Sequence, residues 1–174
     1  ADAQNLLNAG TVIARNARLS AELGGEKLDL PCTDDRQRWA AWNRLYWPVR
    51  RMEHHTQRRW IRTFCAAHGV DLEAYCREQA MGWDELRAIA ADPLCTIGAH
   101  TVTHCNVKSL ADEEALAELV RSADRIEQEL GTRPRHMAYP YGDETSAGLR
   151  DFRFAQQAGY DIAVIICYGM IFPG

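Results

Sequence analysis

The sequence predicts an α/β protein in which a mainly helical N-terminal half precedes a core of alternating strands and helices. Apolar residues make up 47% of the 174 residues and charged residues 25%, which suits one domain with a packed interior. Apolar side chains follow helical spacing over most of residues 1–92, whereas strand and helix patterns alternate over residues 93–174. Such alternation implies right-handed crossovers and a parallel sheet.

The N-terminal half is expected to consist of helices with short connections. Asp34 and Asp35 precede apolar residues at helical spacing and predict a helix N-terminus. Pro48 is expected to interrupt or restart that helix, and Gly69 to end the next one. Two shorter helices are expected at residues 72–78 and 84–90.

The C-terminal half is expected to supply a parallel sheet. Strands are predicted at residues 94–100, 136–141 and 162–167, with helices at 112–130 and 149–158 between them. The run Ile162–Cys167 is apolar throughout, which predicts a strand buried on both faces. Functional groups then belong at the C-terminal ends of the strands.

Charge and composition exclude several classes of protein. A net charge of −4 argues against a nucleic-acid binder, and no run of 18 apolar residues exists to span a membrane. The six cysteines lack paired spacing, so we interpret them as reduced and mostly buried, which leans towards the cytoplasm and leaves one or two disulfides open. Neither end resembles a natural terminus, and we expect the chain to be the middle of a longer protein.

The segment Gly98–His104 is the first candidate for chemistry. His100 and His104 lie four residues apart, just after a predicted strand. Neutral imidazoles are good zinc ligands, and two rings at this spacing reach one ion if the chain turns after the strand. Thr101 is placed to orient a ligand from behind. The alternative is a chance pair among six histidines.

The segment Tyr139–Asp143 is the second candidate. Pro140 and Gly142 predict a tight turn at the end of a strand. Such a turn can point the backbone N–H of Tyr141 into a cleft as an oxyanion donor. The alternative is an ordinary strand-to-helix turn with two packed tyrosines.

Other charged and imidazole groups have simpler explanations. His54 and His55 are expected to be solvated, and His68 to interact with the end of a helix. A solvated helix face, or else an anionic partner, accounts for eight arginines: Arg36, Arg38, Arg44, Arg50, Arg51, Arg58, Arg59 and Arg62.

Together and in this order, the two segments resemble motifs of the polysaccharide deacetylases, carbohydrate esterase family 4, which includes the chitooligosaccharide deacetylases. The stretch Thr96–His104 resembles the family's His-Thr/Ser-x-x-His motif, and Tyr139–Gly142 its next motif. The likeness is close over residues 82–174 and looser over 26–81, which resemble a long insert found in some members.

The resemblance implies part of a distorted (β/α) barrel with a helical insert, and hydrolysis of N-acetyl groups on amino sugars. It implies that His100 and His104 ligate a divalent metal, zinc by preference, together with an Asp. It also implies that Tyr141 supplies the oxyanion N–H, and that Tyr139 and Pro140 lie at the carbohydrate substrate.

The chain departs from the family pattern in three places. The opening Thr-Phe-Asp-Asp-Gly motif, with the base and the Asp ligand, would lie before residue 1; Thr33–Asp35 imitates only its letters. Ala138 stands where many members have Arg, although one subgroup of the family also has Ala at this position. The late motif with a catalytic His would lie beyond Gly174 or has no counterpart here. We therefore expect these 174 residues alone to be inactive.

Two rival functions stay open at this point. One is a non-catalytic carbohydrate-binding or assembly module on the same scaffold. The other is an unrelated structural metal protein with cysteine ligands such as Cys95 and Cys105. A sheet that lacks its first strands also has an exposed edge, so we expect either a second copy that covers it, with or without swapped elements, or poor solubility.

Overall fold

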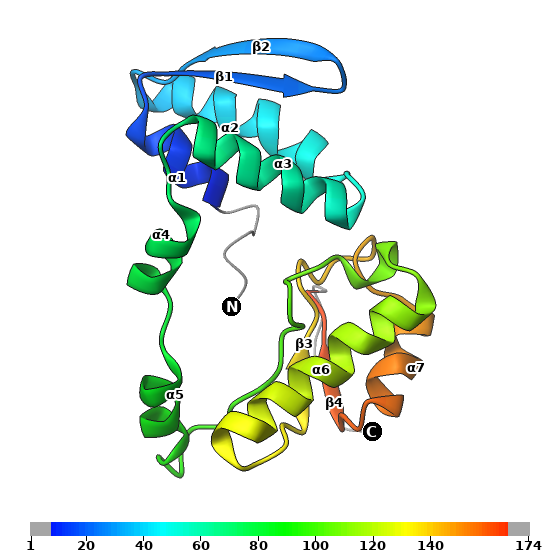
Figure 1. The fold of residues 1–174 in the computed structure, drawn as a ribbon. Coiled ribbons are helices and arrows are strands. Elements are labelled where there is room, and N and C mark those ends of the chain that lie inside the picture. Colours follow the sequence, from blue (N-terminus) through cyan, green and yellow to red (C-terminus); the bar gives the residue numbers. More distant parts are fainter. Residues whose placement is uncertain (1–7, 167–174) are drawn as a thin grey trace. The chain divides into compact units, whose positions relative to one another are not determined.

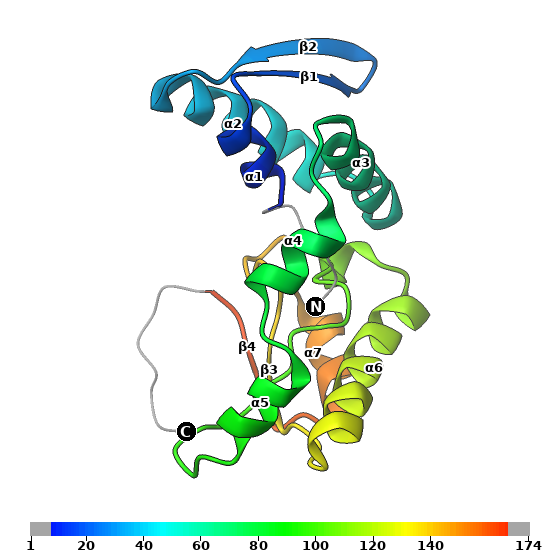
Figure 2. The same ribbon diagram turned by 60° about the vertical axis from the view of Figure 1, so that its left-hand side comes forward.

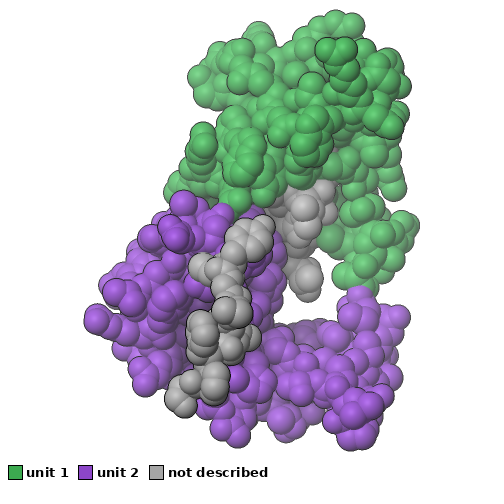
Figure 3. All heavy atoms as spheres, turned by 180° about the vertical axis from the view of Figure 1, so that it is seen from behind, with its two compact units in different colours: residues 1–80 green, residues 81–174 purple. Residues whose placement is uncertain are grey.

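The computed structural model describes residues 8–166, which belong to two compact units, 1–80 and 81–174 (Figure 3). The first unit holds α1 to α4 and a hairpin, and the second holds α5 onwards. The division falls before α5 (Trp83–Ala90), which therefore lies in the second unit.

The first unit packs helices against a two-stranded antiparallel hairpin (Figures 1 and 2). The hairpin joins β1 (Arg18–Leu23) to β2 (Glu26–Pro31), and the sequence reasoning missed it. Gly24 and Gly25 form its two-residue loop with φ of 59° and 84°, a conformation that strongly favours glycine. The helices of the unit are α1 (Asn8–Arg15), α2 (Asp35–Arg50), α3 (His54–Ala67) and α4 (Leu72–Gln79).

Helix α2 begins as predicted and ends differently. The Asp34 side chain accepts a hydrogen bond from the backbone N–H of Gln37 at 2.8 Å, which confirms the predicted cap. Pro48 does not interrupt the helix, so that prediction is wrong. It lies in the last turn before Arg50, where its missing N–H removes one hydrogen bond and little of the helix follows.

The second unit contains a short parallel sheet. Strand β3 (His136–Ala138) pairs in parallel with β4 (Ile162–Val164), and Ala99 forms a parallel bridge to Met137 on the other side. The helices α6 (Asp112–Leu130) and α7 (Leu149–Gln157) contact each other and share one core with β3 (Figures 1 and 2). A 3-10 turn, Val107–Ser109, precedes α6.

The predicted parallel arrangement is confirmed, but the strands are shorter than expected. Only Ala99 of the predicted strand 94–100 pairs with a neighbour. β4 is the edge of the sheet, with Ile162 53% and Val164 51% exposed, so the prediction of a strand buried on both faces is wrong. Cys167 lies outside the described residues. Residues 8–166 show a mixed α/β unit and no closed barrel.

Two expectations from composition can be compared with the described residues. No helix within residues 8–166 is both long and apolar enough to cross a membrane. The five cysteines in this range are free thiols, with Cys32, Cys65 and Cys105 buried and Cys76 and Cys95 partly so.

Candidate functional site

The structure brings His100, His104 and Tyr141 together. The ring centroids of His100 and His104 lie 5.0 Å apart, and those of His104 and Tyr141 5.1 Å apart. The backbone explains why these side chains meet. Ala99 pairs in parallel with β3, so the carboxyl ends of the two segments lie at the same end of the sheet. The predicted proximity of the two motifs is confirmed.

The His100 ring is held by the neighbouring strand. Its Nδ1 lies 2.7 Å from the carbonyl oxygen of Ala138, so the ring takes the tautomer in which Nδ1–H donates. The lone pair is then on Nε2, and the side chain is exposed. A backbone carbonyl on the far nitrogen is the usual way in which proteins orient a metal-ligating imidazole.

His104 is more enclosed, and its environment favours the neutral ring. Burial lowers the pKa of the His104 imidazole below its ordinary value, and the nearby His100 ring lowers it further. Its Nδ1 is buried without a hydrogen-bond partner among the described residues. A half-buried imidazole that favours the neutral form and has a nitrogen without a hydrogen-bond partner is a suitable donor for a divalent metal.

The backbone at these residues is strained. Among residues 8–166, the non-glycine residues with positive φ are Thr101, His104 and Tyr141, at 62°, 54° and 64°. Left-handed conformations at non-glycine residues cost free energy and cluster at functional sites. At Tyr141 the strain has a defined geometry, because the N–H of Gly142 donates to the carbonyl of Pro140 at 2.7 Å across a three-residue γ-turn.

The turn that carries Tyr141 is anchored on both sides. The Tyr139 hydroxyl is buried and donates to the carbonyl of Asp151 at 2.9 Å. Pro140 is fully buried. On the other side, Ile166 donates its N–H to the carbonyl of Gly142 at 2.7 Å. Tyr139 and Pro140 therefore anchor the turn through their buried side chains. Their assignment to substrate binding stays a prediction.

Thr101 lies between the two histidines, and its Oγ1 is buried without a hydrogen-bond partner among the described residues. The neighbouring Cys105 thiol is fully buried, and its pKa is raised to about 12 by burial and then by the charge of Glu118. Within residues 8–166, Cys105 belongs to no group of three or more side chains that could hold a metal ion.

The acidic residues do not complete a metal site. Within residues 8–166 there is no group of three or more His, Cys, Asp or Glu side chains placed to hold a metal ion. Asp143 uses one carboxylate oxygen, Oδ1, to accept from the N–H and hydroxyl of Thr145 and from the hydroxyl of Ser146. The two imidazoles are suitable donor types for a divalent metal but are fewer than the three or four ligands that zinc favours, so metal binding by this pair stays a prediction.

Asp34 and Asp35 match the two Asp residues of the opening motif in residue type alone. In the structure both stabilise the start of α2. Asp34 caps the helix, and Asp35 forms an ion pair with Arg38 at 3.1 Å. Among the other histidines, both His54 and His55 were expected to be solvated. His55 is exposed, but His54 is buried, so the expectation for His54 is wrong. His68 approaches the carbonyl of Phe64 with Nδ1 at 2.8 Å, which confirms its expected role at a helix end.

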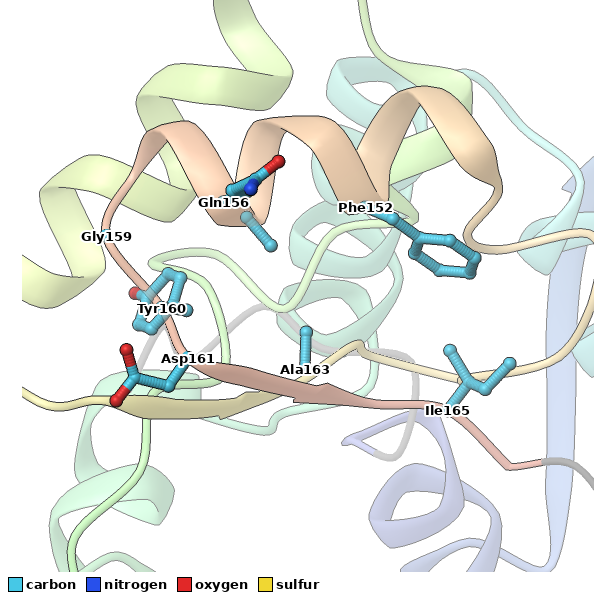
Figure 4. A pocket seen from close by; sticks show the side chains of 8 residues that line it. Phe152, Gln156, Gly159, Tyr160, Asp161, Ala163 and Ile165 are labelled. Atoms are coloured by element: carbon cyan, nitrogen blue, oxygen red, sulfur yellow. The ribbon is translucent and has the colours of Figure 1, made fainter. Parts of the chain in front are cut away.

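A separate hollow of about 710 Å³ lies between α7 and β4 (Figure 4). Phe152 and Gln156 reach it from the helix, and Ala163 and Ile165 from the strand segment. None of its lining residues belongs to the predicted site, so this hollow does not bear on the His100–His104 chemistry.

Sequence reasoning missed Glu118 of α6. Its carboxylate accepts hydrogen bonds from the loop between the two histidines. No spacing pattern marks it, because Glu118 is one of several acidic residues in an amphipathic helix.

Comparison with protein families agrees with the geometry. The family model for polysaccharide deacetylase matches residues 49–163, which include α6, β3, both histidines and the Tyr141 turn. No curated protein and no solved structure matches the chain. A match over more than half of the sequence, joined to the two motifs at one edge of a parallel sheet, shows that the chain belongs to the polysaccharide deacetylase family.

Proposed function

We propose that this chain contributes two metal ligands and an oxyanion donor to an enzyme that hydrolyses N-acetyl groups on amino-sugar polysaccharides or oligosaccharides. The observation that carries the proposal is the convergence of His100, His104 and Tyr141 at the ends of two parallel segments. Membership of the polysaccharide deacetylase family supports deacetylation as the reaction.

In this proposal each residue has one task. His100 would hold the metal through Nε2, since Nδ1 is engaged with Ala138, and His104 would hold it as a neutral ring. Thr101 supports the ligands from behind, and the N–H of Tyr141 donates to the oxyanion that develops on the acetyl carbonyl. A divalent metal, zinc by preference, would polarise that carbonyl and lower the pKa of a water.

The proposal assigns the third ligand and the general base to carboxylates outside residues 8–166. The described residues place no such group with the two histidines. General acid–base help is typically worth about 10² to 10⁴ in rate, and one oxyanion donor about 10² to 10³, so the donor cannot replace the base. The 174 residues alone are therefore expected to release no measurable acetate.

Zinc titration by calorimetry tests the ligand pair without any need for activity. The 174-residue chain should bind zinc weakly, and binding should disappear in His100→Ala and His104→Ala. The exposed histidine His55, changed in His55→Ala, is the matched control and should leave binding unchanged. Tight one-to-one binding that survives His100→Ala would rule out the ligand assignment.

Acetate release tests the reaction. The gene sequence upstream of Ala1 should encode Asp-Asp-Gly after an apolar strand, and a protein extended to include it should deacetylate chitooligosaccharide or peptidoglycan. His104→Ala should abolish that activity. An extended protein that binds the oligosaccharide but releases no acetate would instead indicate a non-catalytic carbohydrate-binding module.

A further inference from the structure

The loop between the two histidines has little to hold it in place by itself. Residues 101–104 belong to no helix or strand, and two of them, Thr101 and His104, have left-handed backbones. A strained loop of this kind keeps its shape only if neighbouring groups fix it.

The Glu118 carboxylate supplies that fixation. Its Oε2 accepts hydrogen bonds from the backbone N–H groups of Val102 and Thr103, each at 2.9 Å. Its Oε1 accepts from the Thr103 hydroxyl at 3.0 Å. Hydrogen bonds to an ionised acceptor are about twice as strong as neutral ones, so three of them are a firm clamp on a four-residue loop.

The Glu118 carboxylate is held in place because the part of α6 that carries it is packed in the core. Glu118 is half-buried on α6, and its helix neighbours Ala115 and Leu119 are fully buried in the core of the second unit. The backbone of α6 therefore cannot shift without disturbing that core. The position of the carboxylate, and through it the position of residues 102 and 103, is set by helix packing.

We propose that Glu118 is a positioning residue that fixes the His100–His104 spacing for metal binding. The inference rests on the proposed metal function of the two histidines. In this role Glu118 would act through the amides of Val102 and Thr103, the two residues before His104.

The test is a Zn²⁺ titration of the full 174-residue chain, followed by ¹H–¹⁵N spectra of the histidine rings, which report weak binding as well as tight binding. Glu118→Ala removes both carboxylate oxygens and with them all three hydrogen bonds, and zinc affinity should fall about tenfold or more, as for other residues that orient ligands. Glu118→Gln keeps the shape and should lose less. Glu113→Ala, an exposed glutamate on the same helix, is the matched control and should bind as the wild type.

Urea unfolding of each variant separates positioning from stability. A merely structural role would lower the free energy of unfolding and leave the zinc affinity of the folded protein unchanged, and that result overturns the inference. If Glu118→Ala does not fold, wild-type affinity in Glu118→Gln overturns it. If His104→Ala also binds zinc as the wild type does, the proposed metal function fails; if only the Glu118 variants do, this inference alone fails.

Discussion

Gly142→Ala should destabilise the second unit through two separable effects. Gly142 has φ of 66°, and a left-handed backbone costs a non-glycine residue about 1–2 kcal/mol. A Cβ at this position would also lie 2.8 Å from the backbone nitrogen and the Cγ1 of Ile166. That nitrogen donates to the carbonyl of Gly142, so the chain cannot retreat without losing the hydrogen bond. Overpacking of this kind costs about 1–3 kcal/mol, for a total of about 2–5 kcal/mol.

Gly131→Ala is the control that separates the two effects. Gly131 has φ of 73°, and a Cβ there would meet no atom within 4 Å. It should therefore lose only the conformational part, about 1–2 kcal/mol. Urea unfolding of the whole chain, followed by circular dichroism, measures both values. Equal losses for the two variants, within about 0.5 kcal/mol, would refute the claim that Ile166 crowds the Tyr141 turn.

Three further predictions concern groups outside the site. Asp34→Ala should lower the free energy of unfolding by about 0.5–2 kcal/mol because a helix cap is lost; Asp35→Ala should change it by less than about 0.5 kcal/mol, and the reverse order in a urea titration would contradict the cap. Burial raises the pKa of Cys65 to about 11 and that of Cys105 to about 12. Both thiols should resist iodoacetamide at about pH 8, as mass spectrometry of the native protein would check, since their thiolate fraction is at most about 10⁻³. Burial raises the pKa of the Tyr160 phenol to about 12. The contribution of this protonated phenol to the free energy of unfolding should therefore be complete below about pH 10 and be lost as pH rises towards 12. A phenolate absorbance titration in which every tyrosine ionises near pH 10 while the chain remains folded would contradict this.

Sequence patterns located the elements whose signals are local. Helix α6 runs over Asp112–Leu130, as its apolar spacing and Gly131 predict. The Asp34 cap is equally local. The hairpin β1–β2 was not predicted, although Gly24-Gly25 is a favoured sequence for a two-residue hairpin turn.

The site divides in the same way. The meeting of His100, His104 and Tyr141 follows from parallel strands ending at one edge, so it was predictable. The Glu118 clamp was not, because it depends on how α6 is rotated against a loop that precedes it. The exposure of Ile162 and Val164 was not predictable either, since an apolar run does not reveal whether another element covers each face of the strand.

The left-handed backbones at Thr101, His104 and Tyr141 have a consequence for protein engineering. Glycine at any of them would relieve strain, so a selection for heat resistance should enrich such substitutions. Two of the three would remove the His104 ring or its aromatic neighbour Tyr141, and the third would loosen the loop between the two histidines. A directed-evolution library screened for thermal tolerance alone should therefore drift away from a working site, and one built for activity should keep these three codons fixed.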